Sequence, residues 1–317
     1  MSDTPLRPTT LGWIGIGRMG SALATRLLTA DCDLTLFNRT RARAEALSPR
    51  GAKLADAPIA LADRDIVFTM VAGPRDFEEV TLGPNGVLAD PEHAPRIIID
   101  STTLSVETSQ RVRAAAAERG TVLLAAPVSG NPKVVSSGKL TIAVSGPHSA
   151  YLEARPFLEL LGRSVTYVGE GDGARIVKIA HNLMLGVVTQ CMAEIVVLAE
   201  ANGVSRTSLL AFLNDSVLGS TFTRYKTPAF VNLDYTPTFT PDLLLKDFDL
   251  GLSAARSAGV PLPLAAVAQQ LVVSLIGHGY TDVDFATLLE LQAQSSGLSL
   301  TSENQDVSDG LDRPIAV

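Results

Sequence analysis

The chain has 317 residues, 46% of them hydrophobic, so it is long enough for two domains and can bury a substantial core. Its formal net charge of −7, with lysine and arginine scattered along the sequence, supplies no basic face for a phosphate backbone and argues against nucleic-acid binding. The polar start, MSDTPLRPTT, lacks an apolar stretch of signal-peptide length, and Gln190 and Glu194 interrupt the richest apolar run. We therefore expect a soluble, cytoplasmic protein without a membrane segment. Cys32 and Cys191 lack metal-ligand spacing, so we expect neither a disulfide framework nor a bound metal.

Short apolar or β-branched runs alternate with helical patterns through the first half of the chain. The predicted strands are LGWI (11–14), LTLFN (34–38), DIVFTMV (65–71), RIIID (96–100), TVLLAA (121–126), KLTIAVS (139–145) and SVTYVG (164–169). This alternation is typical of parallel strands joined by crossover helices that cover both faces of a sheet. We therefore predict an α/β domain over residues 1–170.

The pattern changes after about residue 170. From Gly173 onward, apolar residues recur with the 3.6-residue period of helices and no strand-turn-strand unit is recognisable. The first of these helices, predicted over about 173–201, would be about 40 Å long at a rise of about 1.5 Å per residue. We expect an all-α domain over residues 171–301 that carries the substrate and dimerisation surfaces, followed by a polar, flexible tail over 302–317.

A glycine-rich turn, GIGRMG, directly follows the first predicted strand and directly precedes the helical pattern SALATRLLTA. In this context of strand, turn and helix, the motif favours dinucleotide binding over a turn that serves only packing. The glycines let the backbone approach a pyrophosphate, which the N-terminus of the helix then stabilises. We predict a Rossmann-type domain with a doubly wound parallel sheet. Its predicted cofactor contacts here are Gly15, Ile16, Gly17, Arg18, Met19 and Gly20 of the turn, with Val71 and Ala72 at the end of the third strand.

The end of the second predicted strand indicates which dinucleotide is bound. An NAD site normally places Asp or Glu there, on the ribose 2′-hydroxyl. This chain has no acid at that position, and its residues supply cations with hydroxyl or amide donors that suit a 2′-phosphate. These residues are Asn38, Arg39 and Thr40, with Arg41 and Arg43 behind them. We favour NADP(H), with NAD(H) possible; the alternative is a solvated basic helix start, which fits Arg41 best.

A lysine lies in the middle of an almost wholly apolar helical segment, GARIVKIAHNLMLG (173–186). Asn182 follows Lys178 by four residues, so both side chains share a helix face and can converge on one small substrate. Burial would lower the lysine pKa from its usual value of about 10.4 and suit Lys178 to general acid and base catalysis.

Four separated motifs together resemble the β-hydroxyacid dehydrogenase family, which includes 3-hydroxyisobutyrate dehydrogenase and the glyoxylate or succinic semialdehyde reductases. They are IGIGRMGSALA, similar to the family's cofactor loop, APVSGNPKVVSSGKLTIAVSG, similar to its substrate loop, GARIVKIAHN, similar to its catalytic helix, and LLLKDFDL, similar to its Lys-Asp motif. The resemblance implies a nucleotide-binding domain, a helical domain and an active site between them. It also implies reversible hydride transfer between nicotinamide and a small anionic hydroxyacid or semialdehyde.

The resemblance assigns roles to residues near the substrate. Lys178 matches the family's catalytic lysine, and Asn182 matches the asparagine that follows it by four. Ser129 and Gly130 match the residues that hold the substrate carboxylate, for which a hydroxyl and exposed backbone N–H groups are suitable donors.

The resemblance also assigns residues on the cofactor side. Thr102 and Thr103 follow a predicted strand near the expected position of the nicotinamide. Lys246 matches a lysine that reaches the cofactor side of the cleft, and Asp247 would orient it or cap local structure.

Three positions depart from the family pattern. Ala125 stands where the family commonly has an acid, and Asn131 replaces a glycine, which would add an amide side chain to the substrate loop. His181 replaces the first residue of a usual Asn-Asn pair; it could contact the substrate, but a histidine on an apolar helix is more often a core residue. These departures leave the identity of the substrate open.

Other functions remain as alternatives. Imine reductases look similar over the whole chain but generally lack the lysine found here at Lys178, and 6-phosphogluconate dehydrogenase has a much longer helical region. A non-catalytic NADP-binding sensor or scaffold is the alternative outside enzymes. The few charges between Ile176 and Leu198 suggest that helical domains pack together in a homodimer or homotetramer, with a fully intramolecular core as the alternative.

Overall fold

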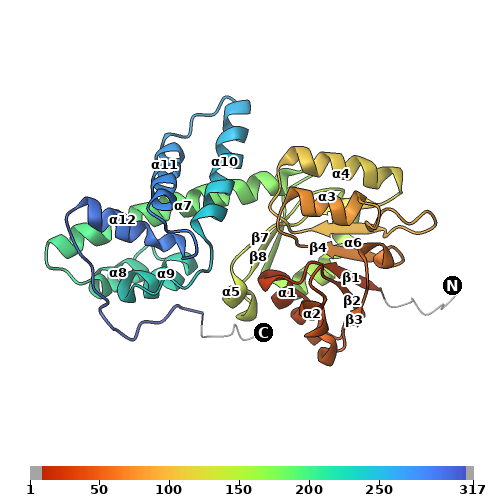
Figure 1. The fold of residues 1–317 in the computed structure, drawn as a ribbon, viewed down its shortest axis with the longest axis horizontal. Helices are drawn as coiled ribbons and strands as arrows, with labels where there is room; N and C mark the ends of the chain where they lie inside the picture. Colours follow the sequence, from red (N-terminus) through yellow and green to blue (C-terminus); the bar gives the residue numbers. More distant parts are fainter. Residues whose placement is uncertain (1–8, 312–317) are drawn as a thin grey trace. The chain divides into compact units, whose positions relative to one another are not determined.

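The computed structural model describes residues 9–311 and divides into two compact units, Met1–Lys178 and Ile179–Val317 (Figure 1). The polar start of the chain, residues 1–8, lies outside the described residues, as do residues 312–317 at the end of the predicted tail.

The first unit is an α/β domain with a six-stranded, fully parallel sheet in the order β3-β2-β1-β4-β5-β6. Its strands are β1 (Leu11–Ile14), β2 (Leu34–Phe37), β3 (Lys53–Leu54), β4 (Ile66–Thr69), β5 (Ile97–Asp100) and β6 (Val122–Ala125). Its helices are α1 (Arg18–Thr29), α2 (Arg41–Glu45), α3 (Pro74–Leu82), α4 (Val106–Glu118), α5 (Pro132–Ser136) and α6 (His148–Leu161). The predicted doubly wound parallel sheet is confirmed.

Both faces of this sheet are buried, which explains its unbroken apolar strands. Side chains alternate between faces along a strand, so Ile97 and Ile99 of β5 enter one core cluster while Ile98 enters the other. The first cluster contains residues of α1 and α6, and the second contains residues of α3 and α4. The carboxyl ends of the strands are thereby held in a fixed order along one edge.

The last two predicted strands belong to a separate sheet, which corrects their assignment to one parallel arrangement. β8 (Thr141–Val144) pairs in parallel with β9 (Ser164–Tyr167), but β7 (Val128–Ser129) pairs with β8 antiparallel. Only residues 130–140 connect β7 to β8, which is too short for the crossover that a parallel pair requires. A short return around α5 therefore shapes the segment expected to bind substrate.

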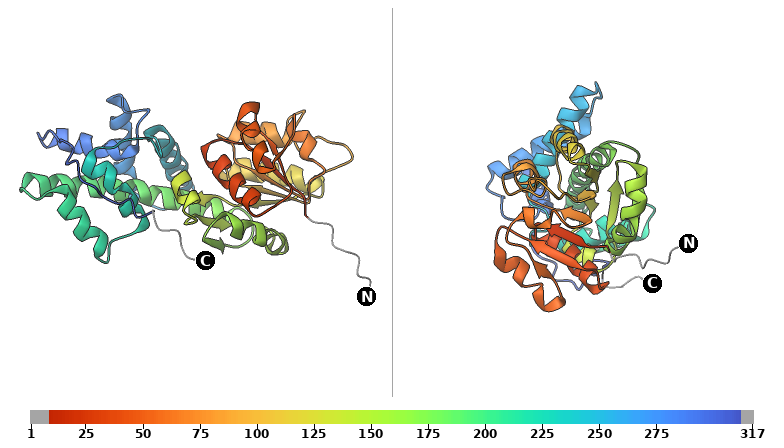
Figure 2. Two further views of the ribbon diagram at one scale, coloured as in Figure 1. Left: turned by 90° about the horizontal axis from the view of Figure 1, so that it is seen from below. Right: turned by 90° about the vertical axis from the view of Figure 1, so that its right-hand side faces the viewer.

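The second unit is helical, as predicted. α7 (Gly173–Ala201) is one unbroken helix (Figure 2) and is followed by α8 (Arg206–Asp215), α9 (Thr221–Asn232), α10 (Pro241–Ser257), α11 (Pro263–Gly277) and α12 (Leu288–Ser295). By length and composition alone, α7 could cross a membrane. However, Met192, Ala193 and Val196 are buried among residues of α8, α9 and α12, so this part of α7 is a core helix.

The described part of the predicted flexible tail is attached to the helical unit. The Glu303 carboxylate accepts hydrogen bonds from the backbone N–H groups of Arg206 (2.6 Å) and Thr207 (3.0 Å). Leu311 is buried at 6% exposure. The expectation of a loose tail is therefore wrong for residues 302–311, because a carboxylate on the first turn of α8 and an apolar anchor hold the polar segment in place.

Candidate active site

The glycine turn between β1 and α1 has the geometry that dinucleotide binding needs. Gly15 has φ of +101°, and a Cβ on Gly20 would lie 2.0 Å from the Gly15 carbonyl oxygen, so neither position tolerates a side chain. A Cβ on Gly17 would meet nothing within 4 Å, which leaves open space at the N-terminus of α1. The turn therefore fits a pyrophosphate group at Gly17.

The side chains of the turn divide between the interior and the surface. Ile16 is buried at 2% exposure, and its backbone N–H donates to Asn38 Oδ1 at 2.8 Å. Met19 packs against the core, whereas Arg18 is exposed. Ile16 thus shapes the turn and does not offer its N–H to a phosphate.

The residues at the end of β2 also divide into two roles. Asn38 Nδ2 donates to the Thr40 carbonyl oxygen at 2.8 Å, so both ends of this amide brace the turn, and a contact of Asn38 with the 2′-phosphate stays a prediction. Arg39 is 85% exposed and pairs with Asp76 at 3.0 Å. Arg41 pairs with Glu45 and Asp56, in line with a solvated helix start. Thr40 and Arg43 are exposed at the same strand end.

The loops after β4 and β5 are joined at the carboxyl edge of the sheet. The Val71 N–H donates to Thr102 Oγ1 at 3.1 Å, and Thr102 is almost completely buried. Val71 and Thr103 are half-buried and Ala72 is exposed, so Thr102 is the one of these four predicted cofactor-binding residues that is buried. Thr102 acts in this structure as a brace between the two loops.

The predicted substrate loop begins at the end of β7. Ser129 is half-buried and Gly130 is exposed with φ of +141°, where a Cβ would lie 2.7 Å from Val134. Asn131 is buried at 8% exposure, and its Oδ1 accepts from the Val134 N–H at 3.0 Å. Asn131 is therefore the N-cap of α5, which uses its side-chain oxygen, and a contact of its amide nitrogen with substrate stays a prediction.

Ala125, the other departure in this loop, is fully buried at the end of β6. Its backbone pairs with Ser145 in an isolated antiparallel bridge. Ala125 therefore lies in the interior of the nucleotide-binding unit.

On α7, Asn182 is held at both ends of its amide. Its Nδ2 donates to the Asp247 Oδ2 at 2.5 Å, and its Oδ1 lies 2.9 Å from His181 Nδ1. Asn182 and Asp247 are both buried, at 3% and 1% exposure, whereas His181 lies at the surface of the helix. This arrangement makes Asn182 a fixed polar group one turn after Lys178, which is half-buried on the same helix face.

Two glycines explain how α7 and α10 come close enough for this contact. A Cβ on Gly186 would lie 2.6 Å from Phe248, and a Cβ on Gly251 would lie 2.6 Å from Leu183. Each glycine stands one helical turn after Asn182 or Asp247. The close approach of the backbones therefore brings the amide and the carboxylate together.

Lys246 lies beside this pair. Its side chain is 37% exposed, and its Nζ lies 3.7 Å from Asp247 Oδ1. Asp247 thus contacts both Asn182 and Lys246, which agrees with its predicted orienting role and adds a partner that the sequence did not indicate.

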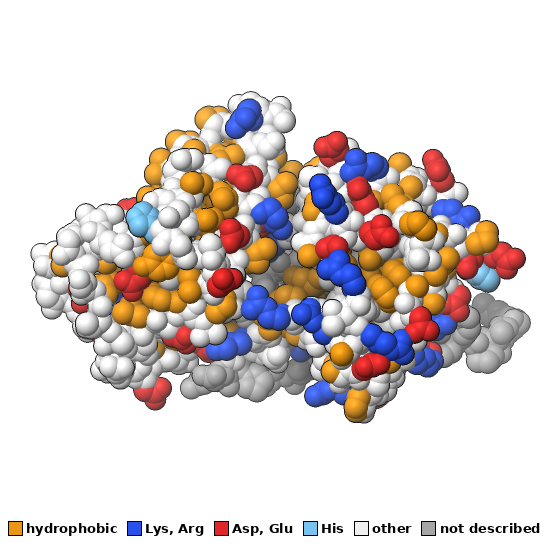
Figure 3. Space-filling view, viewed as in Figure 1, with side chains coloured by type: hydrophobic (Ala, Val, Ile, Leu, Met, Phe, Trp, Pro, Cys, Tyr) orange, Lys and Arg blue, Asp and Glu red, His pale blue; other side chains and the backbone are white. Residues whose placement is uncertain are grey.

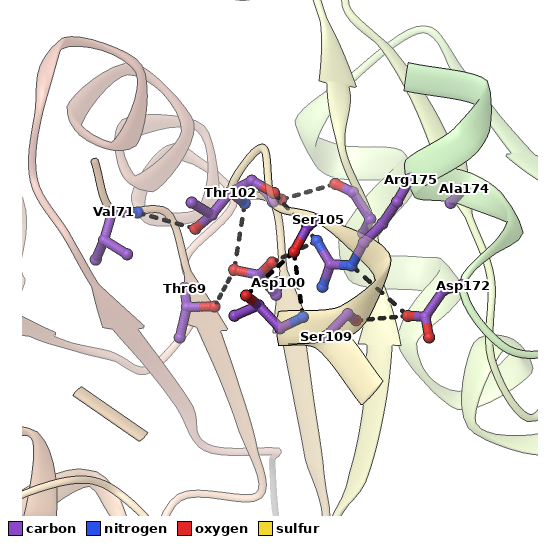
Figure 4. A network of polar contacts seen from close by, with 12 residues as sticks. Thr69, Val71, Asp100, Thr102, Ser105, Ser109, Asp172, Ala174 and Arg175 are labelled. Atoms are coloured by element: carbon purple, nitrogen blue, oxygen red, sulfur yellow. Dashed lines mark hydrogen bonds and ion pairs between the residues drawn. The ribbon is translucent and has the colours of Figure 1, made fainter. Parts of the chain in front are cut away.

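Two further residues were missed from the sequence. Asp100, the last residue of β5, pairs with Arg175 of α7 at 2.9 Å, and both side chains are buried (Figure 4). The sequence did indicate two charged residues in apolar surroundings, since an acid ends the apolar run RIIID and an arginine precedes Lys178 by three residues. The pairing itself joins positions 75 residues apart, which no local pattern reveals.

The parallel sheet, the turn at Gly17 and the polar strand ends define a Rossmann-type dinucleotide-binding protein. Residues 10–169 match a family model described as the NAD binding domain of 6-phosphogluconate dehydrogenase. Residues 171–292 match a model described as NAD-binding of NADP-dependent 3-hydroxyisobutyrate dehydrogenase.

Individual proteins are similar over nearly the whole chain. An NAD-dependent L-serine dehydrogenase of Pseudomonas aeruginosa is 30% identical over 90% of this chain and 99% of its own. Glyoxylate/succinic semialdehyde reductase 2 of Arabidopsis thaliana is 29% identical over 90% of this chain and 80% of its own. The solved structure of Mycobacterium tuberculosis 3-hydroxyisobutyrate dehydrogenase with L-serine is 27% identical, with a TM-score of 0.77 over 90% of this chain and 99% of that one.

The chain belongs to the β-hydroxyacid dehydrogenase family and is an NAD(P)-dependent oxidoreductase acting on a CH–OH group. The resemblance first indicated by the four motifs is thereby confirmed.

Proposed function

We propose that this protein catalyses reversible hydride transfer between NADP(H) and a small hydroxyacid or its semialdehyde, as 3-hydroxyisobutyrate dehydrogenase does. The observation that carries the proposal is the position of Lys178 one turn before Asn182 on one face of α7, with the Asn182 amide held by Asp247. A surface lysine on an amphipathic helix would have no need of a buried, braced amide one turn away.

The chain's own residues supply the proton chemistry. Nicotinamide, when bound, accepts or donates the hydride. Lys178 takes the proton of the substrate hydroxyl during oxidation and returns a proton to the carbonyl oxygen during reduction. As an ammonium it also stabilises negative charge that develops on that oxygen. Asn182 does not titrate, so it orients the reacting groups.

The substrate is a small carboxylate in this proposal. Ser129 and the exposed backbone at Gly130 are the donors suited to its anionic end. A second candidate activity, reduction of glyoxylate or succinic semialdehyde, is favoured by the similarity to the Arabidopsis reductase. Imine reduction is disfavoured, because Lys178 is retained.

The proposed preference for NADP(H) rests on the end of β2. Arg39, Thr40 and Arg43 are exposed there, and no acidic residue occupies the strand end itself. The pairing of Arg39 with Asp76 is exposed and therefore weak, so a 2′-phosphate can displace it.

We also propose a cytoplasmic homodimer or homotetramer that requires no nucleic acid and no membrane. Figure 3 shows acidic and basic side chains interspersed on the displayed face, with groups of hydrophobic side chains over both units. Leu264 and Val267 of α11 are 71% and 62% exposed, which suits association with a second copy, measurable by light scattering.

The function is tested by a panel of substrates. 3-Hydroxyisobutyrate, L-serine and other small hydroxyacids are assayed with NADP⁺ and NAD⁺, and glyoxylate and succinic semialdehyde with the reduced cofactors. Turnover of one of these compounds, faster with the phosphorylated cofactor, is expected. Tight cofactor binding without turnover of any compound would instead support a non-catalytic NADP-binding protein.

A further inference from the structure

A buried ion pair connects the central sheet to the start of α7. Asp100 Oδ2 accepts from Arg175 Nη1 at 2.9 Å, and the two side chains are 0% and 1% exposed. Removing two charges from water is unfavourable, and apolar residues of similar volume often stabilise a fold as well or better. A buried pair of this kind therefore calls for an explanation beyond stability.

The pair is attached to the loops at the carboxyl edge of the sheet (Figure 4). Asp100 Oδ1 accepts from Thr69 Oγ1 at 2.7 Å and from the Thr102 N–H at 3.2 Å. Arg175 Nη1 also donates to the Thr102 carbonyl oxygen at 3.1 Å, and Thr102 Oγ1 accepts from the Val71 N–H. Arg175 is thus bonded directly to the loop after β5, which is expected to lie near the nicotinamide, and this loop is joined to the loop after β4 through Thr102.

A second set of contacts fixes the first turn of α7 from its other side. Asp172 Oδ1 accepts from Ser109 Oγ at 2.5 Å and from Arg113 Nη2 at 2.8 Å, and it lies 3.6 Å from Arg175 Nε. The Ala174 N–H donates to Ser145 Oγ at 3.0 Å. These contacts therefore fix both the rotation of α7 about its axis and the position of its first turn along that axis.

Lys178 follows Arg175 by three residues in the same unbroken helix, about 4.5 Å along its axis. Because a helix is stiff over one turn, the position of Arg175 determines the position of the Lys178 backbone relative to the loops at Val71 and Thr102. All of these residues lie in the nucleotide-binding unit.

We propose that Arg175, held by Asp100, is a positioning residue that places Lys178 relative to the nicotinamide-side loops. This inference rests on the proposed function of Lys178. It assigns to Asp100 and Arg175 an effect on the chemical step and not only on folding.

The test compares Arg175→Met with Arg206→Met. Arg206 is likewise fully buried and paired, with Glu200 at 3.0 Å, but it lies in the helical unit on α8. Four quantities are measured for each folded variant: kcat, the KM for substrate, the Kd for NADP⁺, and the amide hydrogen exchange of residues 174–182. Arg175→Lys, which keeps the charge, serves as the conservative variant.

Arg175→Met should lower kcat by about tenfold to hundredfold, with KM and Kd unchanged, because a misplacement of about 1 Å is enough for such a loss. Exchange at 174–182 should become faster, and Arg175→Lys should recover part of kcat. Arg206→Met should lower the melting temperature without changing kcat. If Arg175→Met does not fold, Asp100→Asn combined with Arg175→Met removes both buried charges, and the same loss of kcat is expected.

Unchanged kcat in the folded Arg175 variants would overturn the inference, as would an equal loss of kcat in Arg206→Met. If the wild-type protein turns over no compound of the panel, the proposed function has failed, and hydrogen exchange decides the structural part separately. Exchange at 174–182 that is the same in Arg175→Met and wild type would then reject the positioning role.

Discussion

The neutral tautomer of His181 follows from its hydrogen-bond partners. A carboxylate oxygen of Asp247 only accepts, so Asn182 must present Nδ2 to Asp247 and Oδ1 to His181 Nδ1. The neutral ring must then carry its hydrogen on Nδ1. The surface histidine that replaces the family's asparagine is therefore oriented by the same buried carboxylate that fixes Asn182.

We expect ¹⁵N NMR to show the Nδ1–H tautomer for neutral His181. Asn182→Ala should convert its signals to those of a tautomer mixture. His278, whose Nδ1 lies 2.8 Å from the Ser274 carbonyl oxygen, provides an internal reference that should not change. A hydrogen found on Nε2 of His181 in the wild-type protein would contradict the chain of contacts from Asp247.

Arg39 carries the proposed cofactor preference. Arg39→Asp should weaken NADP⁺ binding by about 1.5 to 3 kcal/mol, since a hydrogen bond between charged groups is lost, while NAD⁺ binding changes little. Arg41→Asp is the matched control, because Arg41 already pairs with Glu45 and Asp56. Fluorescence titration of each variant with both cofactors measures the change in Kd. Equal losses of affinity for NAD⁺ and NADP⁺ in Arg39→Asp would contradict the assignment of Arg39 to the 2′-phosphate.

At the scale of elements, two glycines of the turn from β1 to α1 have different roles: Gly20 is needed for folding and Gly17 for binding. A Cβ at Gly17 is free of contacts and its φ of −79° suits alanine, whereas a Cβ at Gly20 would overlap the Gly15 carbonyl. Gly17→Ala should therefore keep the melting temperature and weaken dinucleotide binding. Gly20→Ala should lower both the melting temperature and the affinity for the dinucleotide. Calorimetry of each variant with and without NADP⁺ measures this, and unchanged binding in Gly17→Ala would place the pyrophosphate elsewhere.

The start of α7 should be sensitive to acid. Burial raises the pKa of Asp172, but hydrogen bonds from Arg113 and Ser109 outweigh it and hold the pKa below its ordinary value of 3.8. A carboxyl with a depressed pKa stabilises the fold above its unfolded value, and this contribution is lost as pH falls through the folded value. Asp172→Asn should thus reduce stability near neutral pH and lessen the further loss of stability below pH 3.8. Denaturant unfolding at several pH values measures the free energy of unfolding of wild type and variant. An identical loss of that free energy in acid for both proteins would reject this role of Asp172.

For the molecule as a whole, periodic and continuous apolar patterns predicted the elements that bury long faces. β5 was recognisable because all four of its residues are buried, and α7 because its apolar helical pattern continues through 29 residues. The two-residue strands β3 and β7 carry no period, and the pairing that puts β8 and β9 into a second sheet is not encoded in local patterns. Attachment of the tail through Glu303 depends on a partner 97 residues away, which local composition does not encode.

The site residues show the same division. Lys178, Asn182 and the glycine turn could be proposed from motifs, because spacing on one element determines their geometry. The capping role of Asn131 was not predicted, although an asparagine before proline at a helix start is itself an N-cap signal. The partners of Asp100 and Asp247 depend on packing between distant segments, so only the structure reveals them.

The central claim is that Lys178 performs the proton transfer of an NADP(H)-dependent oxidation. The most direct measurement is kcat as a function of pH for Lys178→Met with the best substrate of the panel, beside Lys53→Met, an exposed lysine on β3. In Lys178→Met, kcat should fall by a factor of about 10² to 10⁴, while the melting temperature and the NADP⁺ affinity stay unchanged. Lys53→Met should match wild type. Retention of most of the wild-type rate by Lys178→Met at every pH would contradict the account.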